Sequence, residues 1–187
     1  MNMTPLARIG STLLFSCLTL LVAQAQPSPA KSQISITFKQ MGVPVDAEFK
    51  KVNASVQYNP AKPEAATAQF SIDIASFDLG SPDYNKEVLK PEWFDAARYP
   101  TATFTNTGMK ALSPTQLEAS GKLTLKGKTQ DIRVPVTVKT LGDTTTFDTT
   151  LRIQRTAFQI GTGEWQDTSL VADEVVIRVQ AQTRAVK

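Results

Sequence analysis

The sequence predicts an all-β domain built from antiparallel strands. Over most of the chain, apolar and polar residues alternate with a period of two, which is the spacing of a strand with one buried and one wet face. Gly, Pro and Asn interrupt these runs and mark turns. Helix signals gather in a single stretch, 81–91. Counting the runs gives about eight or nine strands, and the alternation by itself fits a barrel or a sandwich.

The first half of the domain is expected to contain four strands. Residues 26–32 are rich in Pro, Ala and Ser and are expected to form a loose lead-in. Pro44 places the second strand near a sheet edge or a bulge, because proline cannot donate a backbone hydrogen bond. Residues 59–63 have the composition of a turn. The predicted strands cover 34–39, 43–49, 52–58 and 66–74.

One short helix is predicted before the central strand. Ser81 can cap it, Pro82 suits its first turn, and Pro91 stops it. Pro100 then pushes Tyr99 toward an extended conformation, so the chain returns to the sheet. The strands predicted after this point cover 101–106, 117–126, 132–139, 147–153 and 175–180.

Residues 1–25 have the features of a secretory signal peptide. Arg8 supplies the positive charge, 9–23 are mostly apolar, and Ala23-Gln24-Ala25 forms an A-x-A cleavage site. Cleavage would leave 26–187 as one exported domain, expected in the periplasm. A transmembrane anchor is the first alternative, but the apolar run is short for one, so we expect no stable membrane insertion. The second is lipoprotein processing at Cys17, although the apolar run continues past this residue.

Composition excludes several classes of function. The chain has no His, and its single Cys, Cys17, lies in the leader. Ser-His-Asp and Cys-His catalysis are therefore excluded, zinc, copper and haem lose their usual ligands, and no cofactor motif is present. The formal charge of +3 is scattered, which argues against nucleic acid. A hydrolase remains as an alternative, because two carboxylates could act as a pair. The candidates are Asp78, Asp83, Glu87, Glu92 and Asp95, which are equally expected on a solvated helix and its approach.

Three sequence motifs, in order, resemble the YceI-like family of polyisoprenoid-binding proteins. They are FDAARYPTATF at 94–104, GKLTLKGKT at 121–129 and LRIQRTAFQIG at 151–161. The resemblance covers roughly the whole chain after the leader. It implies an extended eight-stranded antiparallel lipocalin-like β-barrel. One departure is that many members carry a His near the position of Gln40, and this chain has none.

The resemblance also implies a function for the apolar faces of the strands. Without it, these faces would be an ordinary core; with it, part of them is expected to line a tunnel for a long apolar chain. The predicted tunnel residues are Phe38, Phe70, Ile72, Phe94, Phe104, Leu123, Phe147 and Phe158. The predicted polar groups at its mouth are Lys86, Lys90, Arg98 and Arg155, of which Arg155 stands in the Arg-x-x-Phe of the third motif.

The sequence therefore predicts an exported, non-enzymatic protein that stores or transports a lipid. The expected ligand is a polyisoprenoid or a quinone-like lipid, and a homodimer is considered. The alternative from another class is a protein-interaction module, in which the barrel is filled and its surface docks a partner.

Overall fold

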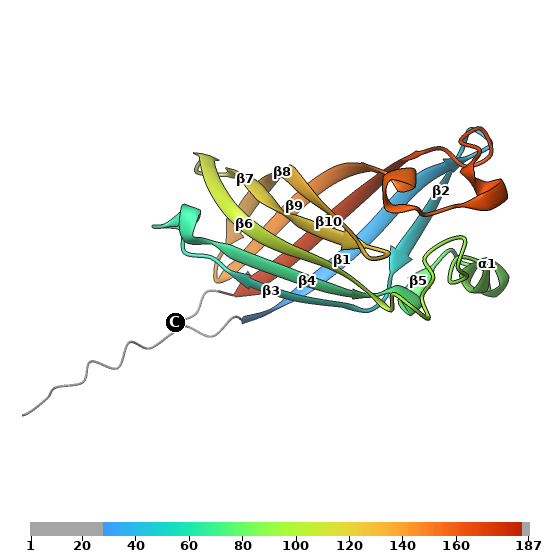
Figure 1. Ribbon diagram of the computed structural model, residues 1–187. Coiled ribbons are helices and arrows are strands. Elements are labelled where there is room, and N and C mark those ends of the chain that lie inside the picture. The colour runs from blue at the N-terminus through green and yellow to red at the C-terminus, as the bar shows by residue number, and fades with distance from the viewer. Residues whose placement is uncertain (1–27, 185–187) are drawn as a thin grey trace, which may run out of the picture.

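A computed structural model describes residues 28–184 of the protein. The predicted signal peptide, residues 1–25, lies outside the described residues. Ten β-strands form one antiparallel sheet (Figure 1). They are β1 (Ser28–Gln40), β2 (Val43–Phe49), β3 (Val52–Gln57), β4 (Thr67–Asp73), β5 (Phe77–Asp78), β6 (Thr101–Ser113), β7 (Gln116–Leu125), β8 (Lys128–Leu141), β9 (Thr144–Gln154) and β10 (Glu174–Arg184).

The sheet closes on itself into a barrel. Its strand order is β10-β9-β8-β7-β6-β4-β3-β1, and β1 pairs back to β10 from Lys31–Gln182 to Thr37–Val176. Eight strands therefore form a closed ring, which removes the free edges of the sheet. The prediction of an eight-stranded antiparallel lipocalin-like barrel is confirmed.

The two strands outside the ring are β2 and β5. Each is separated from a neighbouring ring strand by a short break in the chain. β2 and β3 both pair with β1, and the chain shifts register between them at Lys50 and Lys51. β4 and β5 are likewise separated by a 3-10 helix, η2 (Ile74–Ser76), before β5 pairs with β2. Sequence alternation predicted one strand over 66–74, and the turn at η2 ends it one residue earlier.

The expected loose lead-in over 26–32 is wrong for its described part. β1 begins at Ser28, where Ser28–Ala30 pair with Val56–Ala54 of β3. Lys31 then pairs with Gln182 of β10. These partners are distant in sequence, so local composition could not reveal them. Pairing also carries β6 to Ser113, well past the predicted end at 106, through a register shift between Asn106 and Gly108.

The predicted helix is present but shorter than 81–91. It is α1 (Pro82–Glu87), with Ser81 at its N-cap. Three further 3-10 helices are η1 (Pro63–Ala65), η3 (Arg155–Phe158) and η4 (Gly163–Gln166). Within residues 28–184, no helix combines the length and apolar character needed to cross a membrane.

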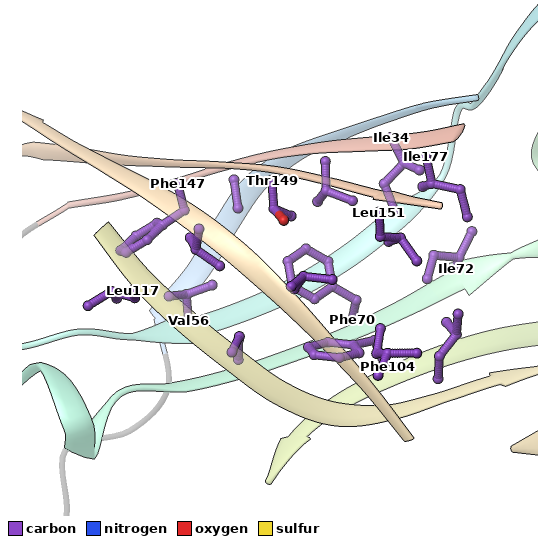
Figure 2. A pocket seen from close by; sticks show the side chains of 18 of the residues that line it. Ile34, Val56, Phe70, Ile72, Phe104, Leu117, Phe147, Thr149, Leu151 and Ile177 are labelled. Atoms are coloured by element: carbon purple, nitrogen blue, oxygen red, sulfur yellow. The ribbon is translucent and has the colours of Figure 1, made fainter. Parts of the chain in front are cut away.

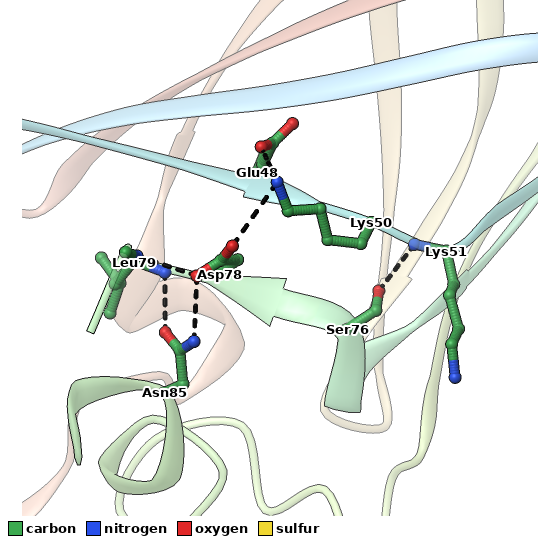
Figure 3. Close-up of polar contacts among 8 residues, drawn as sticks. Glu48, Lys50, Lys51, Ser76, Asp78, Leu79 and Asn85 are labelled. Carbon is green, nitrogen blue, oxygen red and sulfur yellow. Dashed lines mark hydrogen bonds and ion pairs between the residues drawn. The ribbon is translucent and has the colours of Figure 1, made fainter. Parts of the chain in front are cut away.

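Polar contacts fix α1 to the end of β5 (Figure 3). The Asn85 side chain accepts a hydrogen bond from the Leu79 backbone N–H at 2.7 Å and donates one to Asp78 at 2.9 Å. Asp78 also accepts from the Gly80 N–H at 2.8 Å and pairs with Lys50 at 3.5 Å. The helix is thus attached to the barrel wall by side chains on both sides of the connecting turn.

The two ends of the barrel differ. At one end lie the first and last described residues, η1 and the hairpins β6–β7 and β8–β9 (Figure 1). At the other end lie α1 with residues 88–100, and residues 155–173 with η3 and η4. We call this second end the cap, because its segments fold over the barrel where the strands stop.

Candidate functional site

The inside of the barrel holds an apolar cavity of about 130 Å³, here called the barrel chamber (Figure 2). Its wall comes from inward-facing residues of all eight ring strands and from Phe49, and its polar members are Thr67 and Thr149. Both hydroxyls are engaged: Thr149 donates to the Pro135 carbonyl at 2.7 Å, and Thr67 donates to Gln57 at 3.4 Å. The barrel chamber therefore presents hydrocarbon to an occupant.

Period-two alternation places five of the eight predicted tunnel residues in this wall. Phe70 and Phe104 are cross-strand partners with ring centroids 6.3 Å apart, and Phe104 is in turn opposite Leu123. The Phe104 ring occupies the space above Gly121, where a Cβ atom would lie 2.5 Å from Phe104 Cε2. Glycine thus makes room for the aromatic ring. The predicted residues that line the barrel chamber are Phe70, Ile72, Phe104, Leu123 and Phe147.

A second cavity of about 310 Å³ lies under the cap and is here called the cap chamber. Phe49, Leu125 and Ile177 line both chambers, so the two spaces adjoin. Phe38 and Phe94, also predicted as tunnel residues, line the cap chamber. The interior therefore contains two adjoining compartments.

Three phenylalanine rings cluster at the junction of the chambers. Phe49 lies 5.0 Å from Phe77 and 6.2 Å from Phe94, between ring centroids, and Phe77 lies 5.2 Å from Phe94. They come from β2, β5 and the segment after α1. Tilted and edge-on pairs of this kind stabilise beyond the area they bury. The cluster therefore anchors the cap to the barrel wall.

The cap chamber contains polar groups that sequence reasoning did not assign to the site. They are Gln40, Tyr84, Glu87, Trp93 and Trp165. Trp93 and Trp165 pack against each other with centroids 5.3 Å apart. Gln40 is the last residue of β1, and the other four lie on α1, a turn and η4, where no period-two pattern marks the inward face. A weak signal was available for Trp93, which directly precedes the first motif.

The prediction that Arg155 is a free group at the mouth is wrong, because this residue is buried and supports the structure of the cap. It is 2% exposed, and its Nε, Nη1 and Nη2 atoms make five hydrogen bonds to backbone carbonyls. The acceptors are Ala172 at 3.2 Å, Ile160 at 2.9 Å, Gly161 at 3.1 Å, Trp165 at 2.8 Å and Val171 at 2.6 Å.

All five guanidinium N–H groups are therefore in use, and none is left for a phosphate. Burial lowers the pKa of the Arg155 guanidinium, an effect that the nearby Asp173 carboxylate opposes. The guanidinium also lies 5.9 Å from the centroid of the Trp93 ring. Arg155 thus holds residues 160–172 in a loop around itself and forms part of the cap chamber wall.

The three motifs meet at the cap. The Lys126 ammonium of the second motif donates to the Pro91 carbonyl and to the Gln159 carbonyl of the third, each at 2.7 Å. Burial lowers the pKa of Lys126, while Asp95 and Glu92 act in the opposite direction. Tyr99 of the first motif packs on Gly127, where a Cβ atom would lie 2.6 Å from Tyr99 Cε1. Residues of all three motifs therefore take part in the cap.

The other predicted mouth residues are exposed. Lys86 pairs with Asp83 at 3.8 Å, and Lys90 pairs with Glu87, all on or beside α1. Arg98 is exposed, and its guanidinium lies 5.3 Å from the centroid of the Tyr99 ring. None of the three lines a chamber. Lys86, Lys90 and Arg98 are solvent-exposed on or beside α1 and at the corner before Pro100, and their role as mouth groups stays a prediction.

Phe158 also needs correction as a tunnel residue. It is 0% exposed and packs in the core, but it lines neither chamber. The reason is η3, which begins at Arg155 and ends the strand alternation from which an inward position had been extrapolated. Phe158 instead packs in the hydrophobic core cluster with the other buried apolar residues.

Three of the five acidic residues considered for catalysis, Asp78, Asp83 and Glu87, have side-chain partners. Asp78 binds Asn85 and Gly80, and these bonds lower the pKa of its carboxyl group. Asp83 and Glu87 pair with lysines on or beside the same helix, and Glu87 is the member of the set that lines an internal chamber. Within residues 28–184, no group of three or more His, Cys, Asp or Glu is arranged to hold a metal ion.

A closed eight-stranded barrel with an apolar interior and a folded cap defines a lipocalin-like barrel. Residues 26–183 match the YceI-like domain, and the chain belongs to this family.

Among solved structures, Burkholderia cenocepacia BcnA is 48% identical, with a TM-score of 0.79 over 81% of this chain and 96% of that one. A Campylobacter jejuni YceI protein has the same fold at 18% identity, with a TM-score of 0.71 over 96% and 100% of the two chains. So does a polyisoprenoid-binding domain from Saccharophagus degradans, at 18% identity and a TM-score of 0.67 over 83% and 94%.

Curated relatives match over part of their length. A UPF0312 protein of Azotobacter vinelandii is 30% identical over 84 residues, which is 45% of this chain and 44% of the relative. A UPF0312 protein of Vibrio cholerae is 32% identical over 88 residues, 47% of each. The chain thus spans about half the length of the curated relatives it matches.

Proposed function

We propose that this protein binds a polyisoprenoid or a similar amphiphilic lipid, such as a quinone, along the barrel axis. The observation that carries the proposal is the wall of the barrel chamber, which is hydrocarbon apart from two threonine hydroxyls that already have partners. Each methylene group moved from water into such a wall contributes about 0.8 kcal/mol. A prenyl tail would therefore bind without a polar anchor.

The family supports the same ligand class. The Saccharophagus degradans neighbour is described as a polyisoprenoid-binding domain. The adjoining chambers give a long ligand one compartment for its tail and another, with polar groups, for its head. The predicted leader supports an exported, periplasmic protein that stores or ferries a poorly soluble lipid through an aqueous compartment. The side-chain partners of Asp78, Asp83 and Glu87 support a role without catalysis.

The direct test is mass spectrometry of an organic extract from the purified protein. We expect a prenyl lipid or quinone. Repeated absence of lipid, together with failure of added lipid to bind, would refute the proposal and favour the protein-interaction alternative.

A pair of variants tests the location of the ligand. Leu123→Glu places a carboxylate in the barrel chamber wall, where a hydrocarbon tail would have to desolvate it at a cost of several kcal/mol. Thr105→Glu adds the same charge on the outer face, opposite Lys122. With both variants shown folded by circular dichroism, lipid titration should fail for Leu123→Glu and remain near wild type for Thr105→Glu. Equal affinities would place the ligand outside the barrel.

A further inference from the structure

One residue that lines the cap chamber has a buried hydrogen-bond donor without a partner. Among the described residues, the buried side-chain polar groups that lack one are the Trp93 Nε1–H and the Ser32 hydroxyl. Ser32 lines neither chamber, whereas Trp93 lines the cap chamber between Trp165 and Arg155. A buried donor left unpaired costs free energy, and an acceptor supplied by a ligand would remove that cost.

The charges of the cap chamber do not suit an anion. Its charged lining residues are Arg155 and Glu87. Arg155 donates all five N–H groups to backbone carbonyls and lies near the Asp173 carboxylate, whose negative charge offsets its positive charge. Glu87 is a carboxylate, and Lys90 already pairs with it. A phosphate here would meet a negative group and no free cationic donor.

We propose that the cap chamber selects an uncharged head group whose oxygen accepts a hydrogen bond from Trp93 Nε1–H. This rests on the proposed function, since it assigns the head of the lipid whose tail lies in the barrel. A prenol hydroxyl and a quinone carbonyl share this chemistry. A prenyl diphosphate, in contrast, is selected against by Glu87. The other polar groups, Gln40 and Tyr84, are exposed, so water competes for them.

The chain offers a direct observation of the Trp93 donor. It contains two tryptophans, Trp93 and Trp165, so a ¹⁵N-indole spectrum has two side-chain signals, and Trp165→Phe assigns them. Four probes of matched tail length would be titrated: a prenol, a quinone, a prenyl diphosphate and a polyisoprene hydrocarbon without oxygen. We expect the Trp93 indole proton to move downfield with the prenol, the quinone or both, and not with the hydrocarbon.

Affinities supply the second arm. Trp93→Phe should reduce the affinity for the neutral probe that bears oxygen by roughly tenfold more than the affinity for the hydrocarbon. This is the usual effect of losing one hydrogen bond to a buried acceptor. Wild type should bind the diphosphate less tightly than the prenol. Glu87→Gln should reduce this difference in affinity between the prenol and the prenyl diphosphate. Asp83→Asn should leave it unchanged, because Asp83 lies on the same helix but its side chain is 95% exposed and lines no chamber.

The outcomes separate this inference from the proposed function. If every probe including the hydrocarbon binds but Trp93 responds to all of them alike, the head-group site is wrong and the lipid-binding barrel stands. Tightest binding of the diphosphate, unaffected by Glu87→Gln, would likewise overturn the head-group site alone. If no probe binds, both proposals fail.

Discussion

Replacing Arg155 should destabilise the cap far more than replacing an ordinary surface arginine. The guanidinium is 2% exposed and supplies five hydrogen bonds to carbonyls within residues 160–172. Hydrogen bonds to charged groups each contribute about 1.5–3 kcal/mol net, but five cannot be summed when a whole domain is stable by about 5–15 kcal/mol. Because the loop can relax and water can reach some carbonyls, we expect Arg155→Ala to cost about 3–5 kcal/mol, the range for breaking a buried charged network.

The assay is urea denaturation followed by tryptophan fluorescence and by far-ultraviolet circular dichroism. Trp93 and Trp165 flank Arg155, so fluorescence reports on the cap while circular dichroism reports on the barrel. Arg152→Ala is the matched control, because Arg152 lies on β9 with its side chain 63% exposed, 3.6 Å from Glu174. An exposed pair of this kind contributes at most about 1 kcal/mol. Arg155→Lys should also be destabilised, since an ammonium has three donors and cannot span the same carbonyls.

Two results would refute this reasoning. Equal losses for Arg155→Ala and Arg152→Ala would mean that the carbonyl network contributes little. A stable Arg155→Ala that loses binding of a prenyl diphosphate alone would restore the sequence-based hypothesis that Arg155 is a head-group anchor.

Three further predictions follow from single contacts. Gly121→Ala should cost about 1–3 kcal/mol in urea denaturation, because its Cβ would lie 2.5 Å from Phe104 and 2.7 Å from the Thr105 carbonyl; no loss would mean that the strands shift freely. Phe104→Ala should cost up to about 3–5 kcal/mol, and an unchanged midpoint would show that the ring adds nothing to the chamber wall. For Asp78, bonds from Asn85 lower the pKa of the carboxyl below its ordinary 3.8. Its stabilisation should therefore be present above pH 3.8 and disappear as the pH falls through the folded value, so the stability difference between wild type and Asp78→Asn should close in acid.

Strand positions were predictable wherever one face of a strand is buried. The run Ala68, Phe70, Ile72 alternates with polar residues because each inward position meets the barrel interior, and the structure places all three in the chamber wall. The start of β1 was not predictable, because Ser28–Ala30 are held by β3 and Lys31 by β10, both remote in sequence. Pairing of this kind overrides local composition.

The site was predictable to the same depth. Alternation identified the wall of the barrel chamber, but it carries no information beyond the strand ends, where the cap chamber lies. Arg155 follows a strand and belongs to the third motif, so its positive charge was the reason to predict an anchor for a lipid head group. Its actual role depends on backbone carbonyls spread over residues 160–172. The fold of this segment brings the carbonyls to the guanidinium, and Gly161 leaves room for it. A Cβ atom at Gly161 would lie 2.2 Å from Arg155 Nη1.

The motif residues that build the cap and most of the residues that present polar groups to the cap chamber are therefore different sets. Tyr99, Gly127, Arg155 and Gly161 from the three motifs interlock to build the cap. Gln40, Glu87 and Trp93 lie outside the motifs and present polar groups to the cap chamber. A barrel wall of hydrocarbon recognises a tail through its apolar area and discriminates little between head groups. If the barrel binds a lipid tail as proposed, discrimination between lipids would come from polar groups that contact the head, and members that share the motifs could share the barrel while differing in the lipid they select.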